Sequence, residues 1–321
     1  MKKILFFFIA LAPCLFAQNY EEIYLKNGPS AVIEAIEKNI LSKDYWLNKL
    51  KDKDVRYGYY DNEILLSVVD KTDKELEVIS YKDGVTKKLF SSSVIVGKNG
   101  DKLLEGDLKT PVGVYQLTRR FTPNDRYLGP LAFSLSYPNL LDKLAKRNGS
   151  GIWIHGYPLD GQRTDELKTK GCVAMQNEIL MKFDEVIDHK KTLAFIYEDK
   201  RPEASANDIA VIISGILNWK KTWSESDIDS YLKFYDKDFE RYDGMSLENF
   251  KNMKRAIFSK KEKKHIAFSN FLITPYPNLK NDKLFRVSFY EDYAADTHKF
   301  AGQKTLYVKL YGDEMKIFIE E

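Results

Sequence analysis

The chain has 321 residues, a length typical of about two globular domains. Hydrophobic residues make up 44% and charged residues 30%, which is the balance of a soluble folded protein and excludes a disordered chain or a protein with several membrane spans. The formal net charge of +3 is too small to indicate nucleic acid or an anionic membrane as a partner.

Residues 1–17 have the pattern of a cleavable secretory signal. Two lysines form a basic start, an apolar run follows from Ile4 to Leu11, and small or apolar residues lead to Ala17. The apolar run is too short to span a bilayer comfortably. We therefore expect the mature chain to begin near Gln18 and to act in a bacterial periplasm, with an uncleaved anchor as the alternative.

The cysteines bear directly on the chemistry. Cys14 lies in the signal, so the mature protein carries Cys172 alone and forms no intrachain disulfide. A single thiol in an oxidising compartment is at risk of oxidation. On count alone it is either a buried structural residue or a nucleophile, and the local sequence has to decide.

Residues 18–61 predict a small helical unit, and residues 62–199 predict a β-rich domain. In the first segment apolar residues recur at helical spacing, and a Gly-Pro-Ser break places a helix start near Ser30, the expected N-cap. In the second segment the period changes to that of strands. Asp83-Gly84 predicts a hairpin turn. The expected strands are 64–69, 76–81, 89–96, 112–117, 152–154 and 193–197.

After a linker at 199–202, residues 205–321 show the reverse order, with helices before strands. This order predicts an α+β domain in which helices pack on a bent antiparallel sheet, folded as a unit of its own. The expected helices are 209–223, 227–235 and 247–258, and the expected strands are 265–273, 284–293, 305–310 and 315–319.

One strand of the β-rich domain ends in a histidine. Alternation places Trp153 and His155 on one face of that strand. Further along, Gly171 precedes Cys172. An imidazole beside a thiol favours the thiolate and carries the proton to a leaving amine, and a glycine lets backbone N–H groups approach an oxyanion. These residues are the minimum set for acyl transfer.

Two motifs resemble the signature of the YkuD-type L,D-transpeptidases. The first is His155-Gly156 followed by Thr169-x-Gly171-Cys172, and the second is the upstream segment 106–115, which is similar to the family's Gly…Thr-Pro-x-Gly-x-Tyr. The resemblance covers about 62–199. It implies a β-rich catalytic fold and acyl transfer on peptidoglycan stem peptides, with Cys172 as nucleophile, His155 as base and the Gly156 carbonyl orienting the imidazole.

Two positions depart from the family pattern. Lys170 stands where a histidine usually precedes Gly-Cys, and Ala174 stands where an arginine or asparagine is usual. Thr169, Lys170, Gly171 and Ala174 are the residues expected to form the oxyanion site and the walls of the active site. Both departures therefore change the walls that a substrate or acceptor would meet.

The whole layout is similar to a narrower group, the periplasmic L,D-carboxypeptidases that trim peptidoglycan and set cell shape in helical bacteria. In that group a C-terminal nuclear-transport-factor-like (NTF2-like) domain follows the YkuD-type domain. The resemblance implies an α+β multidomain protein that removes the terminal D-alanine of a tetrapeptide with water as the acceptor.

Other polar residues are weaker candidates. Arg119, Arg120, Tyr127 and Trp153 could bind the substrate, since arginine suits carboxylates, although a solvated charged loop explains the arginines equally well. No His-x-His or His-Glu-x-x-His spacing occurs, so we expect no metal and no cofactor. Aromatic strands in the C-terminal domain could bind glycan, and that domain could also support a homodimer.

Three functions stay open at this point. The first is the carboxypeptidase. The second is a transpeptidase of the same chemistry, in which an amine from another stem resolves the acyl-enzyme and forms a 3–3 crosslink. The third is a catalytically idle scaffold that binds the cell wall, and the intact Cys172, His155 and Gly156 argue against it.

Overall fold

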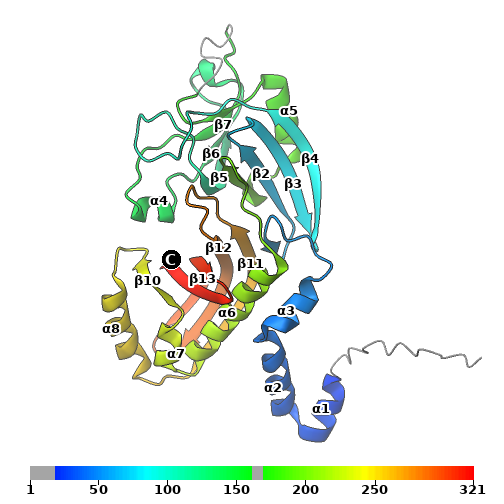
Figure 1. Ribbon diagram of the computed structural model, residues 1–321, viewed down its shortest axis with the longest axis vertical. Coiled ribbons are helices and arrows are strands. Elements are labelled where there is room, and N and C mark those ends of the chain that lie inside the picture. The colour runs from blue at the N-terminus through cyan, green and yellow to red at the C-terminus, as the bar shows by residue number, and fades with distance from the viewer. Residues whose placement is uncertain (1–18, 161–168) are drawn as a thin grey trace, which may run out of the picture.

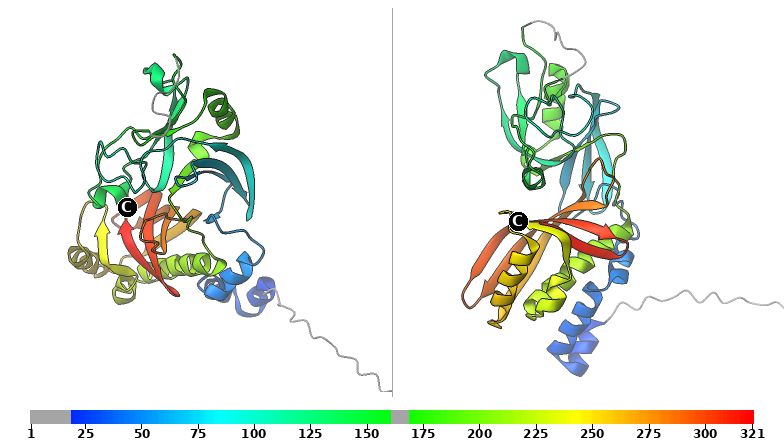
Figure 2. Two further views of the ribbon diagram at one scale, coloured as in Figure 1. Left: turned by 45° about the horizontal axis from the view of Figure 1, so that its top comes forward. Right: turned by 60° about the vertical axis from the view of Figure 1, so that its left-hand side comes forward.

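The computed structural model describes residues 19–160 and 169–321 (Figure 1). The expected signal at residues 1–17 lies outside the described residues. Among the described helices, none is long and apolar enough to cross a membrane. The β-rich domain forms one end of the molecule, and the C-terminal domain and the N-terminal helices form the other (Figures 1 and 2).

The N-terminal helical unit packs on the C-terminal domain. Leu50 and Val55 are part of the hydrophobic core of that domain. The short strand β1 (Tyr59–Tyr60) pairs antiparallel with β11 (Lys264–Pro275) of its sheet. The residues just before the β-rich domain therefore join the distant C-terminal sheet. The helices are α1 (Tyr20–Asn27), α2 (Pro29–Ile40) and α3 (Lys43–Leu50).

The expected N-cap at Ser30 is wrong. Helix α2 begins at Pro29, and Gly28 is its N-cap. Proline suits the first helical position because its missing N–H would have no partner inside the helix.

The β-rich domain is built on an eight-stranded mixed sheet in the order β4-β3-β2-β9-β5-β6-β7-β8. The pairs β2–β9 and β7–β8 are parallel, and the other pairs are antiparallel. After β4, Ile95 forms a bridge with Ala174 of β8, so the sheet curls back on itself. The strands are β2 (Ile64–Asp70), β3 (Glu75–Lys82), β4 (Val85–Ser93), β5 (Gly113–Phe121), β6 (Ala132–Leu135), β7 (Trp153–His155), β8 (Val173–Ala174) and β9 (Thr192–Tyr197).

Most expected strands of this domain are confirmed. The turn between β3 and β4 consists of Asp83 and Gly84, both at positive φ, as a two-residue hairpin turn requires. Strands β6 and β8 and the helices α4 (Leu140–Leu144) and α5 (Asn177–Val186) were not expected. A strand of two to four residues is too short to show a period of two.

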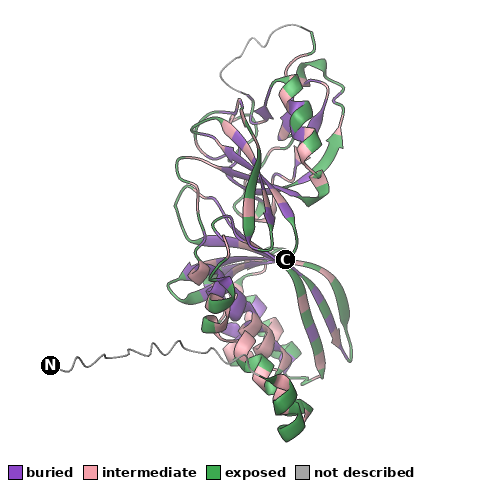
Figure 3. Cartoon of the chain, turned by 90° about the vertical axis from the view of Figure 1, so that its right-hand side faces the viewer, coloured by how far each residue is buried: buried purple, intermediate pink, exposed green. Residues whose placement is uncertain are grey.

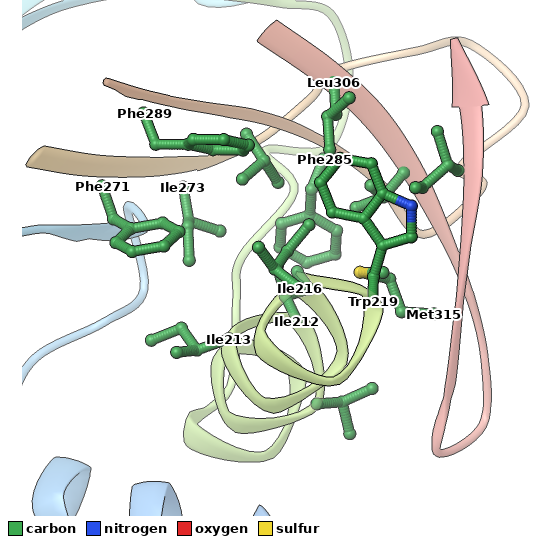
Figure 4. Close-up of a cluster of buried hydrophobic side chains, with 14 of the residues drawn as sticks. Ile212, Ile213, Ile216, Trp219, Phe271, Ile273, Phe285, Phe289, Leu306 and Met315 are labelled. Carbon is green, nitrogen blue, oxygen red and sulfur yellow. The ribbon is translucent and has the colours of Figure 1, made fainter. Parts of the chain in front are cut away.

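The C-terminal domain packs helices on a curved six-stranded sheet in the order β1-β11-β12-β13-β14-β10. The buried face of the first helix carries Ile212, Ile216 and Trp219 toward Phe285 and Leu306 of the sheet (Figure 4). The elements are α6 (Ala206–Ser224), α7 (Ile228–Leu232), β10 (Tyr235–Arg241), α8 (Leu247–Phe258), β11, β12 (Leu284–Ala295), β13 (Lys299–Tyr311) and β14 (Glu314–Glu320).

One expected helix of this domain is too long. The sequence predicts a helix through Tyr235, but α7 ends at Leu232 and Tyr235 begins strand β10. Strand β10 pairs parallel with β14, a partner about eighty positions further along the chain. The local hydrophobic period carries no information about such a distant partner. Hydrogen bonds to that partner nevertheless favour a strand over a helix at Tyr235.

The two domains share buried side chains where they meet. One hydrophobic cluster combines Leu66 and Phe195 of the β-rich domain with Tyr276 and Tyr307 of the C-terminal domain. Figure 3 shows buried residues continuing through this junction. The C-terminal domain is thus in apolar contact with the β-rich domain. The sequence predicted a separately folding unit and did not predict this contact.

Candidate active site

His155 and Cys172 are brought together by two short neighbouring strands. Strand β7 ends at His155, and β8 begins directly after Cys172. The two strands are parallel, and His155 lies opposite Ala174. Paired strands lie about 4.8 Å apart and alternate residues share a face, so the thiol and the imidazole belong to the same face of the sheet.

A hydrogen bond to the neighbouring backbone orients the imidazole of His155. The residue is only 1% exposed. Its Nδ1 lies 2.7 Å from the carbonyl oxygen of Gly156, and Nδ1 must be the donor because a carbonyl only accepts. In the neutral ring, Nε2 then carries the lone pair. This arrangement suits a ring that is to accept a proton at Nε2, and the role of His155 as base stays a prediction.

A tight turn before β8 presents the thiol. Cys172 is half-buried, and its Sγ donates to the carbonyl oxygen of Gly151 at 3.4 Å. The Thr169 hydroxyl donates to the carbonyl oxygen of Cys172 at 2.5 Å and accepts from the N–H of Gly171 at 3.1 Å. Binding of an oxyanion by the Gly171 N–H would require the latter bond to open, and this role stays a prediction.

The two departures from the family pattern differ in exposure. Lys170, two residues before Cys172, is exposed. Ala174 is fully buried, and its backbone exchanges two hydrogen bonds of 2.8 Å with Ile95. Of these two expected wall residues, Lys170 is therefore the one whose side chain can meet a substrate.

The position of Gly156 depends on the absence of a side chain. A Cβ at Gly156 would lie 2.2 Å from Oδ1 of Asn177 and 3.1 Å from Cδ of Pro130. The same Asn177 oxygen accepts from the N–H of Tyr157 at 2.9 Å. Asn177 thus fixes the backbone that carries the Gly156 carbonyl. The sequence analysis did not identify Asn177, because no motif marks this position.

The expected substrate-binding residues divide between the two faces of the sheet. Trp153 shares the face of His155, and its ring meets Phe121 edge-on at 4.9 Å, while the Arg119 guanidinium lies 4.7 Å from the centre of the Phe121 ring. Arg120 points to the opposite face, where it forms a two-pronged ion pair with Asp184 of α5. Of the two arginines, only Arg119 remains a candidate for substrate binding.

Tyr127 lies in a segment that covers the His155-Gly156 corner. It belongs to the 3-10 helix Arg126–Leu128 and is 39% exposed. The carbonyl oxygen of Leu128 accepts from the N–H of Gly156 at 3.2 Å. The backbone segment that carries Tyr127 therefore lies against the His155-Gly156 corner, and substrate binding by Tyr127 stays a prediction.

The 97–112 loop, which contains most of the upstream motif, packs under the turn that carries the thiol. A Cβ at Gly171 would lie 2.7 Å from the carbonyl oxygen of Lys109, so the loop and the turn are in direct backbone contact. The N–H of Gly97 donates to the Thr110 hydroxyl at 2.8 Å, which closes the loop on itself.

Buried charges anchor the same loop. Lys71 pairs with Glu198 at 2.7 Å, and both bond to the backbone of Gly100. Arg147 pairs with Asp101 at 2.6 Å and with Asp142 at 2.9 Å. Burial raises the pKa of Asp101, and it raises the pKa of Asp142 to about 6 although Arg147 opposes the shift.

The described residues contain no cluster of three or more histidine, cysteine or acidic side chains that could hold a metal ion.

The C-terminal domain contains a cavity away from His155 and Cys172. Its volume is about 670 Å³, and on β12 and β13 its lining includes Tyr293 and Phe300, which face each other across the strand pair, together with Glu291 and Lys304. Lys304 is paired with Glu320 at 2.8 Å. The cavity thus combines aromatic rings with buried charges.

Comparison with known proteins identifies the family. A model of the L,D-transpeptidase catalytic domain, YkuD, matches residues 66–196, and a model of the Cds6 C-terminal NTF2-like domain matches residues 211–321. The crystal structure of the helical cell shape determining protein Pgp2 from Campylobacter jejuni is 48% identical, with a TM-score of 0.83, over 88% of this chain and 99% of that one. The chain belongs to the YkuD-type L,D-transpeptidase family. Like Pgp2, it carries the NTF2-like domain.

A more distant relative shares this arrangement. The structure of Bd1075 from Bdellovibrio bacteriovorus is 28% identical, with a TM-score of 0.64, over 84% of this chain and 96% of that one. No curated protein matches the chain. The expected fold class, with N-terminal helices, a β-rich YkuD domain and an NTF2-like domain, is confirmed.

Replacing Gly156 by alanine is expected to lower turnover at least about a hundredfold, because the new methyl group displaces the carbonyl that orients His155. The measurement is the initial rate on a soluble substrate, with circular dichroism to check folding. Gly215→Ala is the matched control, since a Cβ there meets only Met315 at 3.3 Å. Equal activity of the two variants would contradict the assigned role of Gly156.

Proposed function

We propose that this protein is a cysteine L,D-carboxypeptidase that trims peptidoglycan tetrapeptide stems to tripeptides. The observation that carries the proposal is the parallel pairing of β7 with β8, which sets Cys172 beside a histidine whose Nδ1 is bonded to Gly156. That arrangement leaves Nε2 as the base for the thiol. Membership of the L,D-transpeptidase-type enzyme family supports peptidoglycan peptides as the kind of substrate.

The reaction proceeds through an acyl-enzyme. His155 Nε2 takes the thiol proton, and Cys172 Sγ attacks the carbonyl of the diamino acid before the terminal D-alanine. The oxyanion binds backbone N–H groups of the turn around Cys172. Collapse breaks the C–N bond, and His155 returns the proton to the amino group of D-alanine, which leaves. His155 then activates a water molecule, which hydrolyses the thioester and releases the tripeptide and the thiol.

A transpeptidase is the second candidate, because the family model that matches residues 66–196 is named for that activity. The first half of the reaction is the same, and an amine from another stem replaces water in the second half. The two functions differ only in which acceptor the site admits after D-alanine leaves, and Lys170, exposed and two residues before Cys172, is the residue that we propose meets that acceptor. Intact catalytic residues argue against a non-catalytic scaffold.

An extracytoplasmic location follows from the family, since its substrate, the peptidoglycan, lies outside the cytoplasm. The secretory pattern of residues 1–17 supports the periplasm, and a role in cell shape is supported by the name of Pgp2.

The cavity of the NTF2-like domain supports glycan binding there. Aromatic faces suit the apolar faces of sugar rings, and Trp223 and Tyr293 stack at 5.1 Å beside Phe300 in its lining. Because of this cavity, we favour ligand binding over homodimer formation as the function of this domain.

Mass spectrometry of muropeptides after incubation with the full-length protein tests the proposal. A disaccharide tetrapeptide is expected to become the tripeptide with release of one D-alanine. A 3–3 crosslinked dimer or exchange with an added D-amino acid would identify the transpeptidase instead. An unchanged tetrapeptide would refute both.

Cys172→Ala is expected to abolish turnover without unfolding the protein, because the nucleophile is lost while the half-buried methylene remains. Native Cys172 should also react with iodoacetamide as the single thiol of the mature chain. A variant with normal activity would contradict the mechanism, as would a native thiol that alkylates no faster than a free cysteine.

His155→Ala is expected to lower kcat by about a hundredfold or more, the usual scale for a general acid–base. His189→Ala and His265→Ala serve as controls and should stay within about twofold of the parent protein. An equal loss in either control, with folding intact, would show that the catalytic base is misassigned.

Phe300→Ala is expected to weaken binding to purified sacculi while leaving turnover of a soluble muropeptide unchanged, because this side chain is 42% exposed and lines the cavity. Tyr290→Ala is the matched control, because Tyr290 lies on β12, the other cavity-lining strand, but is not part of the cavity lining and is similarly exposed. Unchanged sedimentation of Phe300→Ala with sacculi would argue against a glycan site in this cavity.

A further inference from the structure

The β11–β12 hairpin of the NTF2-like domain reaches into the catalytic domain near the 97–112 loop. Tyr276, directly after β11, is 1% exposed and lies in the cluster that joins the two domains. A Cβ at Gly113 would lie 2.5 Å from the Tyr276 hydroxyl oxygen. The hydroxyl therefore rests on the backbone of the glycine that follows the Thr-Pro-Val segment of the upstream motif.

The same hydroxyl accepts a hydrogen bond from the catalytic domain. Nδ2 of Asn139 donates to it at 2.7 Å, and the only other bond of this amide nitrogen among those described is the longer one of 3.3 Å to the Val114 carbonyl. Asn139 is the N-cap of α4, and it forms a reciprocal capping box with Asp142. Figure 1 shows α4 on the side of the catalytic domain that faces the NTF2-like domain.

From α4 the contacts continue to the loop beneath the thiol. Arg147 bridges Asp142 and Asp101, and the other oxygen of Asp101 accepts from the N–H of Val112 at 2.8 Å. Val112 ends the 97–112 loop, in which the Lys109 carbonyl meets Gly171. The carboxylates of Asp101 and Asp142 are buried and Arg147 is 19% exposed, so loss of the arginine would leave two buried carboxylates with little access to water.

We propose that Tyr276 is a positioning residue for acyl transfer, through which the NTF2-like domain holds the 97–112 loop against the turn that carries Cys172. The geometry that supports it is the unbroken set of contacts from the Tyr276 hydroxyl through Asn139, Asp142, Arg147 and Asp101 to Val112. The NTF2-like domain thereby completes the catalytic site in addition to its own cavity. The inference rests on the proposed acyl transfer at Cys172.

Tyr276→Phe removes the hydroxyl and keeps the ring that packs on Tyr307 at 5.5 Å. In the full-length protein, kcat on a soluble tetrapeptide muropeptide is expected to fall about tenfold while KM stays within twofold, because the substrate still binds but meets a misplaced thiol. Tyr307→Phe is the matched control, since this buried tyrosine lies in the same cluster and interacts with Arg286 of its own domain. The control should leave kcat unchanged.

Asn139→Ser tests the set of contacts from Tyr276 to Val112 independently. Serine keeps the oxygen that caps α4 but lacks the amide that donates to the Tyr276 hydroxyl. The variant should lower kcat as Tyr276→Phe does, and the double variant should be no slower than either single one. Unchanged kcat in Tyr276→Phe, an equal loss in Tyr307→Phe, or effects that add fully in the double variant would each overturn the proposal.

The rate at which iodoacetamide alkylates Cys172 gives a readout that needs no substrate. It should fall severalfold in Tyr276→Phe and not in Tyr307→Phe, and an unchanged rate in Tyr276→Phe would overturn the proposal. If the parent protein itself leaves tetrapeptides intact, the carboxypeptidase assignment fails while this measurement still decides the role of Tyr276.

Discussion

The parallel pairing of β7 with β8 is the constraint on which the catalytic site depends. Three residues of β7 and two of β8 are enough to form this pair, which sets His155, the last residue of β7, opposite Ala174. Cys172 directly precedes β8 and, two residues before Ala174, shares the face of His155. The pair could not keep this register without support from its neighbours, because two strands this short form few hydrogen bonds with each other.

Support for the pair comes from both sides and from below. Strand β6 pairs with β7, and Ile95 bridges to Ala174 of β8, so the short pair has a backbone partner on each side. Asn177 fixes the Gly156 backbone, and the 97–112 loop contacts the turn at Gly171. The catalytic groups are thus held by backbone contacts and buried ion pairs, which are less mobile than exposed side chains. Such rigidity is what a nucleophile and its base require for a reproducible approach to the substrate.

The sequence predicts that His155 and Cys172 act together, because both stand in short local motifs that can be read without the fold. Period-two alternation correctly puts Ile154 and His155 on opposite faces, and the Asp83-Gly84 turn and helix α8 also follow from local patterns. Strand β8 and the pairing of β10 with β14 do not, since they depend on partners far along the chain.

The same limit applies to the supporting residues. Asn177 and Tyr276 act through contacts between distant segments, and neither stands in a motif. Arg120 was a reasonable carboxylate ligand by type, yet its partner is Asp184 on the other face of the sheet. Residue type can be read from the sequence, but the face on which a residue acts depends on the register of its strand.

The central claim is that Cys172 forms an acyl-enzyme with the stem peptide. Its most direct test is the intact mass of the full-length protein after acid quenching during turnover of a tetrapeptide muropeptide. The account predicts one adduct with the mass of the muropeptide less D-alanine, located on the peptide that contains Cys172 and absent from Cys172→Ala. Turnover without any such adduct, with a slow-release substrate analogue also leaving none, or an adduct on another residue, would contradict it.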